Sequence, residues 1–220
     1  MRNMSIAEIC QILIGPALLS TLKMLLIASF LSAILGCILA ILLIVTNKDG
    51  LRPRPHIYNI LDTIVNIIRS FPFIILIVAI IPFTRFIAGT SIGIKGAVVP
   101  LTIAATPFMA RVIEGSLKEV DKSLIEAAKS FGASDWQIIF KVMFVEAIPS
   151  IISGLCLAIV NLLGATAMAG AVGAGGLGAV AITYGYQSFN DQVMYLVVIV
   201  LIIMVQCIQL AGNYLYKKLK

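Results

Sequence analysis

The sequence predicts an all-α membrane protein, with about five transmembrane helices and a helical cytoplasmic loop, folded as a single domain over residues 1–220. The 220 residues are 60% hydrophobic and only 12% charged, and their mean hydropathy is +1.08. Soluble domains carry about 25% charged residues. Several uncharged apolar runs are also long enough to cross a bilayer core, which needs about 20 residues as a helix. These observations exclude an ordinary soluble protein.

Four of the five expected transmembrane helices are simple apolar segments. Residues 24–45, 147–170 and 193–215 contain no charged side chain at all. Residues 96–110 form a shorter apolar run that ends against Arg111. Each of these segments is therefore expected to cross the membrane as one helix.

The remaining segment, residues 57–83, has two interpretations, because it contains Asp62, Arg69 and Pro72. Proline has no backbone donor, so the chain forms either one continuous span or an interfacial helix followed by a short span. In a continuous helix, Asp62 and Arg69 lie seven residues apart on one face and share a hydrated cavity. If Pro72 marks an interfacial break, Arg69 lies near the lipid headgroups instead.

The basic residues indicate how the chain is oriented. The net charge is +6, and most of the 16 lysines and arginines fall in three segments, 48–54, 111–141 and 217–220. Positive residues favour the cytoplasmic side of a membrane. We therefore expect the N-terminus outside and the C-terminus in the cytoplasm, with lipid rather than nucleic acid as the partner of this charge.

Residues 170–178 have the sequence GAVGAGGLG. Gly173, Gly175 and Gly178 match G-x-G-x-x-G, but a dinucleotide site needs this motif between a strand and a helix, whereas here it follows a transmembrane helix. The chain also has no P-loop motif. Two interpretations remain: a tight helix interface followed by a flexible loop, or the wall of a translocation path. We expect the path wall for the run as a whole.

The loop at about residues 114–146 is expected to contain two helices. Two capping boxes begin them, S-x-x-E at Ser123 to Glu126 and S-x-x-Q at Ser134 to Gln137. Gly132 is placed to end the first helix as a left-handed cap. That helix is too short to be stable alone. Its apolar stripe packs either on the protein's own spans or in a groove of a partner, and consists of Leu124, Ile125, Ala128 and Phe131.

The first loop helix resembles the EAA signature of bacterial ABC importer permeases. The matching residues are Glu126, Ala127 and Ala128, followed after three residues by Gly132. In that family this helix inserts into a cleft on the ATPase subunit. The resemblance therefore implies a coupling role for Ser123 and for the four residues of the motif.

A longer resemblance, to the methionine-importer permeases, is carried by residues 69–93, 164–178 and 184–190. It implies a bacterial inner-membrane permease with five helices per subunit. The expected partners are a second copy of the chain, ATPase subunits that bind ATP and Mg²⁺, and an extracytoplasmic methionine-binding protein, commonly a lipoprotein.

The same resemblance marks Met168 as a gate. Met168 matches the family position that narrows the path near the two-fold axis, while filling of the core is the alternative for a methionine. Gly170 and Gly173 follow it and are expected to line the path. The pore itself is expected on the symmetry axis of the dimer.

No catalytic or metal-binding arrangement is present in the sequence, and the four cysteines show no C-x-x-C spacing. The chain is therefore expected to be a transport subunit without its own cofactor, not an enzyme. Three alternatives remain open: an importer of another small amino acid or peptide, an ion-gradient-driven secondary transporter, and a non-transporting scaffold. A secondary transporter predicts internal repeats and paired interior charges.

Overall fold

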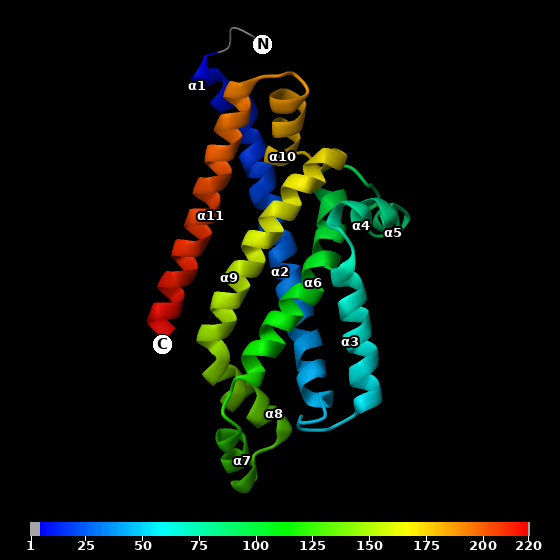
Figure 1. The fold of residues 1–220 in the computed structure, drawn as a ribbon, viewed down its shortest axis with the longest axis vertical. Helices are drawn as coiled ribbons and strands as arrows, with labels where there is room; N and C mark the ends of the chain where they lie inside the picture. The colour runs from blue at the N-terminus through cyan, green and yellow to red at the C-terminus, as the bar shows by residue number, and fades with distance from the viewer. Residues whose placement is uncertain (1–4, 220) are drawn as a thin grey trace.

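The computed structural model describes residues 5–219, and in this part of the chain every regular element is a helix. Four helical runs are long and apolar enough to cross a membrane. They are α1 (Ile6–Ile9) with η1 (Cys10–Ile14) and α2 (Gly15–Thr46); α6 (Gly93–Lys118); α8 (Asp135–Gln137) with η2 (Ile138–Met143), α9 (Phe144–Ala169) and η3 (Gly170–Ala174); and α11 (Asp191–Leu219). Figure 1 shows them as one elongated bundle, and the predicted all-α membrane fold is confirmed.

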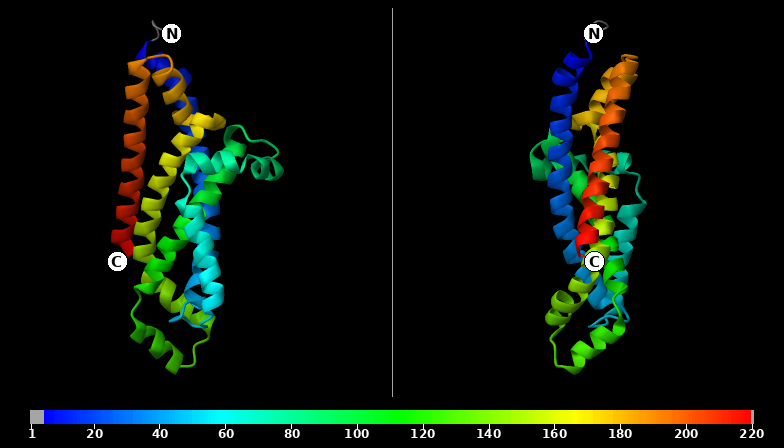
Figure 2. Two further views of the ribbon diagram at one scale, coloured as in Figure 1. Left: turned by 45° about the vertical axis from the view of Figure 1, so that its right-hand side comes forward. Right: turned by 90° about the vertical axis from the view of Figure 1, so that its left-hand side faces the viewer.

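The fifth expected span is broken in two. Helices α3 (Pro55–Ser70) and α4 (Phe73–Ala79) meet at an angle of 104°. Phe71, between them, is extended with ψ 130°, because the ring of Pro72 disfavours helical geometry in the residue before it. Of the two interpretations of residues 57–83, the structure has the break at Pro72, although the helix before the break, α3, packs along α6 (Figure 1). Helix α5 (Ile81–Ala88) follows α4, and both project sideways from the bundle (Figure 2).

Small residues hold the centre of the bundle together. A stripe with a spacing of four is buried on α2 where that helix packs along α6, and comprises Ala28, Ser32, Gly36 and Ala40. A β-carbon on Gly36 would lie only 3.0 Å from Cβ of Met109 on α6. Ser32 donates a hydrogen bond of 3.4 Å to the backbone oxygen of Thr102. Such stripes let two helix backbones approach closely where lipid supplies no hydrophobic driving force.

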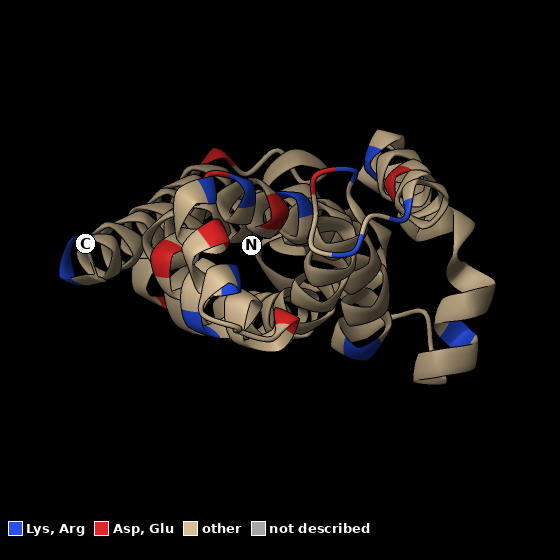
Figure 3. Ribbon diagram, turned by 90° about the horizontal axis from the view of Figure 1, so that it is seen from below, with Lys and Arg blue, Asp and Glu red and all other residues tan. Residues whose placement is uncertain are grey.

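The two ends of the bundle differ in charge. The start of α2 and the start of α11 lie at one end, whereas the connection after α2 and helix α7 (Lys122–Ser130) lie at the other (Figure 1). Segments 48–54 and 118–129, which together hold six lysines and arginines, belong to the α7 end, which Figure 3 shows from below. The two connections that are rich in Lys and Arg thus lie at the same end of the bundle, as the predicted orientation of the chain requires. The assignment of the α7 end to the cytoplasm stays a prediction.

The glycine run reverses the chain at the end of α9. Gly173, Gly175 and Gly176 all have positive φ, of 95°, 80° and 77°, a conformation that costs glycine little and other residues more. Helix α10 (Gly176–Val180) then folds back and continues into η4 (Ala181–Tyr186). The run is thus a kink between helical segments, and the start of α10 is attached to α2, where Thr21 Oγ1 accepts from the Leu177 amide at 2.9 Å.

Two glycines of the run form a direct backbone contact. A β-carbon on Gly170 would lie 2.4 Å from the nitrogen of Ala179, and one on Gly178 would lie 2.1 Å from the oxygen of Ala167. Neither distance leaves room for a side chain, because the opposing atoms belong to the backbone. Gly170 and Gly178 therefore form the tight interface of the first interpretation, and the path-wall interpretation of the run stays a prediction.

Replacement of Gly178 by valine is expected to destabilise the fold by about 1–3 kcal/mol or more, since the added atoms overlap backbone that cannot move away freely. The measurement is the thermal unfolding midpoint of the detergent-purified protein. Gly164→Ala is the matched control, because nothing lies within 4 Å of a β-carbon there and alanine favours the helix. An equal midpoint for Gly178→Val and wild type would contradict the close contact.

Candidate functional site

The coupling loop begins with an aspartate cap. Asp121 is the N-cap of α7, and its Oδ1 accepts a hydrogen bond of 2.8 Å from the backbone nitrogen of Ser123. This hydrogen bond lowers the pKa of the Asp121 carboxyl, which stays ionised at the positive end of the helix dipole. The predicted capping box from Ser123 to Glu126 is wrong, because Asp121 already caps the helix and Ser123 lies inside its first turn.

The end of α7 follows the prediction. Gly132 has φ 76°, and its amide donates to the oxygen of Lys129 at 2.9 Å while the amide of Ala133 donates to the oxygen of Ala128 at 3.1 Å. This pair of hydrogen bonds is the Schellman motif, which needs a left-handed residue at Gly132. The second predicted box is also confirmed, since Ser134 and Gln137 cap each other at the start of α8.

The two proposed faces of α7 are both present. Ile125 and Ala128 are partly buried against a cluster that includes Leu117, Ile139 and Met143 of the protein's own spans. On the outer side, Glu126 and Ala127 are exposed. Leu124 and Phe131 are exposed too, and Phe131 retains 90% of its accessible surface. The apolar stripe of α7 therefore has two parts: Ile125 and Ala128 pack on the bundle, whereas Leu124 and Phe131 are not covered by other residues of the chain.

Aromatic rings extend this exposed surface. Trp136, Phe140 and Phe144 stack in sequence, with ring centroids 5.5 Å apart in each pair. Trp136 is 66% exposed and lies just after the Gly132 turn. We define the loop apex as α7, Phe131, Gly132 and Trp136. It is the part of the bundle farthest from the N-terminal end in Figure 1.

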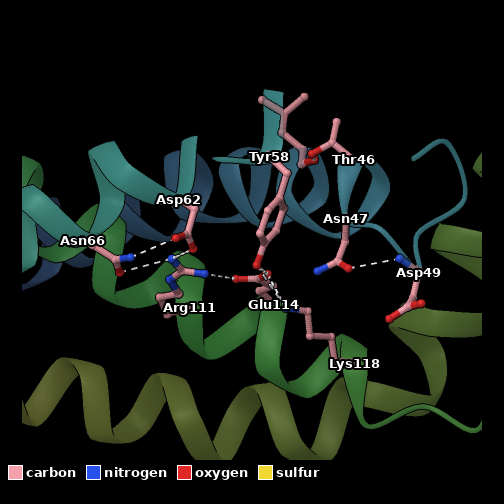
Figure 4. A network of polar contacts seen from close by, with 10 residues as sticks. Thr46, Asn47, Asp49, Tyr58, Asp62, Asn66, Arg111, Glu114 and Lys118 are labelled. Carbon is pink, nitrogen blue, oxygen red and sulfur yellow. Dashed lines mark hydrogen bonds and ion pairs between the residues drawn. The ribbon is translucent and has the colours of Figure 1, made fainter. Parts of the chain in front are cut away.

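A charged network connects α3 with α6 (Figure 4). Its centre is Glu114, which is only 2% exposed. Lys118 Nζ lies 2.6 Å from Glu114 Oε1, and Arg111 Nη1 lies 2.7 Å from Glu114 Oε2. Arg111 also forms an ion pair with Asp62 through Nη2. Two carboxylates are thus matched by two cations between α3 and α6, with Glu114 buried and Asp62 and Lys118 partly exposed.

Neutral groups on α3 complete the network. Asn66 Nδ2 donates to Asp62 at 3.0 Å, and Asn66 Oδ1 accepts from Arg111 at 3.2 Å. Tyr58 donates to Glu114 at 3.4 Å, and Lys118 lies 5.6 Å from the centre of the Tyr58 ring. We define the α3–α6 network as these residues: Tyr58, Asp62, Asn66, Arg111, Glu114 and Lys118.

Sequence reasoning missed this network. Asp62 and Arg69 do lie two turns apart on the one helix α3, but they do not pair: Arg111 of α6 forms the ion pair with Asp62, whereas Arg69 lies beside the ring of Phe108. Nothing in the sequence singled out Glu114 as a buried residue, since it follows an apolar run where the cytoplasmic loop was expected to begin. The signal that could have found it is helical spacing: Tyr58, Asp62 and Asn66 recur every four residues, and so do Glu114 and Lys118.

The remaining predicted residues are placed as follows. Met168 is 51% exposed near the end of α9. Gly170 is buried against α10, and Gly173 forms the reversal, with Ile92 the nearest side chain to its missing β-carbon at 3.7 Å. The exposed residues Asn161, Gly164 and Met168 share one face of α9, because they are spaced by three and four. A gating role of Met168 stays a prediction.

Comparisons with known proteins agree with this architecture. Residues 32–220 match the family described as binding-protein-dependent transport system inner membrane component. The chain is 46% identical over 198 residues to the probable D-methionine transport system permease protein MetI of Vibrio cholerae, covering 90% of this chain and 88% of the relative. It is 44% identical over 172 residues to the methionine import system permease protein MetP of Bacillus subtilis, with 78% of each covered.

Solved structures give the same result. A chain of the MetNI methionine ABC transporter in an inward-facing conformation superposes with a TM-score of 0.95, at 40% identity, covering 99% of this chain and all of the other. A chain of an amino acid ABC transporter with histidines shares the fold at a TM-score of 0.77 and 18% identity. On this sequence and structural likeness, the chain belongs to the binding-protein-dependent transport system inner membrane components and, within them, to the MetI and MetP permeases.

Proposed function

We propose that the chain is the membrane permease subunit of an ATP-driven importer of methionine, of either stereochemistry, or of a closely similar amino acid. The observation that carries this proposal is the loop apex, where a capped helix bearing Glu126, Ala127 and the Gly132 turn is fixed to the bundle on one side and uncovered on the other. An uncovered amphipathic helix suits insertion into a partner's groove. The names of the relatives support methionine as the cargo.

The proposal assigns the chemistry to partners. Separate ATPase subunits bind ATP and Mg²⁺ and dock on the loop apex, through Ser123, Glu126, Ala127, Ala128 and Gly132. A second copy of the chain completes a path along the two-fold axis, which is consistent with the many exposed apolar side chains on α2 and α11. An extracytoplasmic methionine-binding protein, commonly a lipoprotein, delivers the substrate on the other side of the membrane.

The contacts around the loop support a route by which a force on the apex reaches the spans. Val120 and Leu117 join α6 to the cluster that supports α7. Ser150 of α9 donates to Glu119 at 3.2 Å, and Arg52 pairs with Asp135 at 2.5 Å. The α3–α6 network then links α6 to α3. A displacement of α7 by the ATPase is therefore carried to α3, α6 and α9 together, as alternation between two states requires.

The network also bears on the secondary-transporter alternative, which predicted paired interior charges. Its four charged groups form two acid–base sets that neutralise each other, and membership of the permease family favours ATP as the energy source. Uptake into proteoliposomes separates the two functions. ATP inside vesicles that contain the assembled transporter is expected to drive accumulation without an ion gradient; accumulation driven by a gradient alone would overturn the proposal.

Replacement of Gly132 by valine is expected to reduce ATP-linked uptake by about tenfold or more without loss of membrane insertion. A β-branched residue is strained at φ 76°, so the turn opens and the apex is displaced. The measurement is methionine uptake by reconstituted transporter. Gly132→Asn, which tolerates left-handed geometry, is expected to retain most activity.

Gly89→Val is the matched control for Gly132→Val, because Gly89 has φ 72° and nothing within 4 Å of a β-carbon, but lies at the end of α5. Normal uptake by Gly132→Val, or an equal loss with Gly89→Val, would contradict the docking assignment.

Replacement of Met168 by alanine is expected to increase leak of small solutes from proteoliposomes in the absence of ATP, since a shorter side chain leaves the path wider. The measurement is efflux of a preloaded amino acid. Leu26→Ala is the control, because Leu26 is similarly exposed, at 67%, on α2. An unchanged leak in the Met168 variant would assign that side chain to packing.

Replacement of Glu114 by alanine is expected to cost about 3–5 kcal/mol of stability, because Arg111 and Lys118 then lose their buried counter-charge. The thermal midpoint of the purified protein should fall, and ATP hydrolysis by the complex should lose its dependence on substrate delivery. Glu146→Ala removes an exposed carboxylate of α9 and is the control. Equal midpoints for the two variants would show that the network does not stabilise the fold.

A further inference from the structure

A cavity of about 390 Å³ lies beside the chain break, between α3, α6 and α9. Its size is at the lower end of the roughly 300–1,000 Å³ of small-molecule pockets in proteins. The residues that decide its chemistry are one cation, one amide and three aromatic rings: Arg69, Asn161, Phe71, Phe73 and Phe108. The rest of the wall is formed by Ile68, Leu162 and four alanines of α6 and α9.

Arg69 brings an uncompensated charge to this cavity. Its guanidinium lies 5.9 Å from the centre of the Phe108 ring. Within residues 5–219, no carboxylate lies within 4.0 Å of it. Asp62, the acid nearest in sequence on α3, is already held by Arg111 and Asn66. The α3–α6 network is therefore electrically closed, and Arg69 is left outside it.

The neighbours of Arg69 indicate how deep its charge lies in the membrane. The cavity reaches Ala104 to Phe108, in the middle of α6, and Ala158 to Ala165, in the second half of α9, and both helices are long and apolar enough to span the membrane. The second sequence interpretation, with Arg69 at the headgroups, therefore does not fit its neighbours. A cation at the centre of a membrane span costs about 2.5–3.5 kcal/mol when it faces lipid. The guanidinium must instead face water or an anionic ligand in the cavity.

The other walls limit the kind of anion. Asn161 is exposed on α9 and offers both amide donors and an amide oxygen. The aromatic faces suit an apolar chain and also attract a cation. A cation, an amide and aromatic rings together match the carboxylate, the ammonium group and the apolar side chain of a free amino acid. A guanidinium binds a carboxylate through two parallel hydrogen bonds, so it is the natural anchor of such a site.

We propose that this cavity is a substrate-binding site within the membrane, where Arg69 binds the carboxylate of the transported amino acid, Asn161 contacts its ammonium group, and Phe71 and Phe108 contact its side chain. This site rests on the proposed import of methionine or a similar amino acid, and it adds the residues that hold the substrate. Met168 lies seven residues after Asn161 on the same exposed face of α9, so the site and the predicted gate occupy one continuous surface.

Photolabelling of the detergent-purified permease–ATPase complex tests the site. The probe is a diazirine analogue of methionine, and labelled peptides are identified by mass spectrometry. In wild type, label is expected in peptides that contain residues 104–108 or 158–165. In Arg69→Gln, the half-saturating concentration should rise about tenfold to a hundredfold, as for loss of a hydrogen bond to a charged group. Arg69→Lys should lie between the two.

The matched control is Arg85→Gln, which removes a cation of α5 that lies outside the cavity and donates to Ser91. It is expected to label like wild type. Competition with methioninol, which has a hydroxyl in place of the carboxylate, adds a second readout. Methioninol should compete much more weakly than methionine in wild type, and this difference should disappear in Arg69→Gln. An unchanged difference, or label confined to other helices, would overturn the site.

Asn161→Asp is a second test of the site, for use if the Arg69→Gln permease does not assemble with the ATPase. The new carboxylate would pair with Arg69 within the cavity and reduce labelling by at least about tenfold, whereas unchanged labelling would overturn the site. ATP-driven uptake by wild type separates this proposal from the function on which it rests. Absence of that uptake refutes the importer, while normal uptake with labelling insensitive to Arg69 and Asn161 refutes the site alone.

Discussion

Compensation of charge inside an apolar bundle is the constraint on which this structure depends. A carboxylate or a guanidinium within a membrane span is costly unless a partner neutralises it. Glu114 meets this requirement with Arg111 and Lys118, and Asp62 meets it with Arg111. These pairs fix α3 against α6, and because α6 leads directly into α7, they place the broken span and the loop apex in one mechanical unit.

The same constraint distinguishes structural charge from functional charge. The network is closed, since its acids and bases match in number and its Asn and Tyr groups fill the remaining hydrogen-bonding positions. Arg69 lies on the same helix as Asp62 but two turns further on, beside Phe108, and takes no part in the network. A closed set of charges explains a stable helix contact, whereas an unpaired charge beside a cavity is free to bind water or an anionic ligand. Arg69 is therefore where the structure points toward the substrate.

Small residues meet the second requirement of a membrane fold, close packing without a hydrophobic driving force. The stripe of α2 allows α6 to approach, and Gly170 and Gly178 allow α10 to fold back on α9. These contacts fix the end of α9 that carries Met168, so the predicted gate stands on a rigid support. The glycine run combines the two interpretations that its sequence left open: its tight contacts position the helix that is expected to line the path.

Much of this protein was determined by the sequence alone, because the deciding signals are local. Apolar length predicts the spans, Pro72 marks the position of a break in one of two interpretations, and Gly132 with the Ser134 to Gln137 box predicts the turn after α7. The EAA motif likewise indicates the coupling loop, since a short docking helix is defined by consecutive residues. Where two local signals competed, as at Asp121 and Ser123, the earlier and stronger cap began the helix.

Only the tertiary structure decided which distant groups meet. The partner of Asp62 is Arg111, 49 residues away, and not Arg69, seven residues away on the same helix, because α3 packs against α6 and brings Arg111 beside Asp62. The burial of Glu114, the cavity at Arg69 and the contact of Gly170 with α10 likewise arise from segments far apart in the chain. Side-chain spacing gives the face of a helix, but it does not say which helix that face will meet.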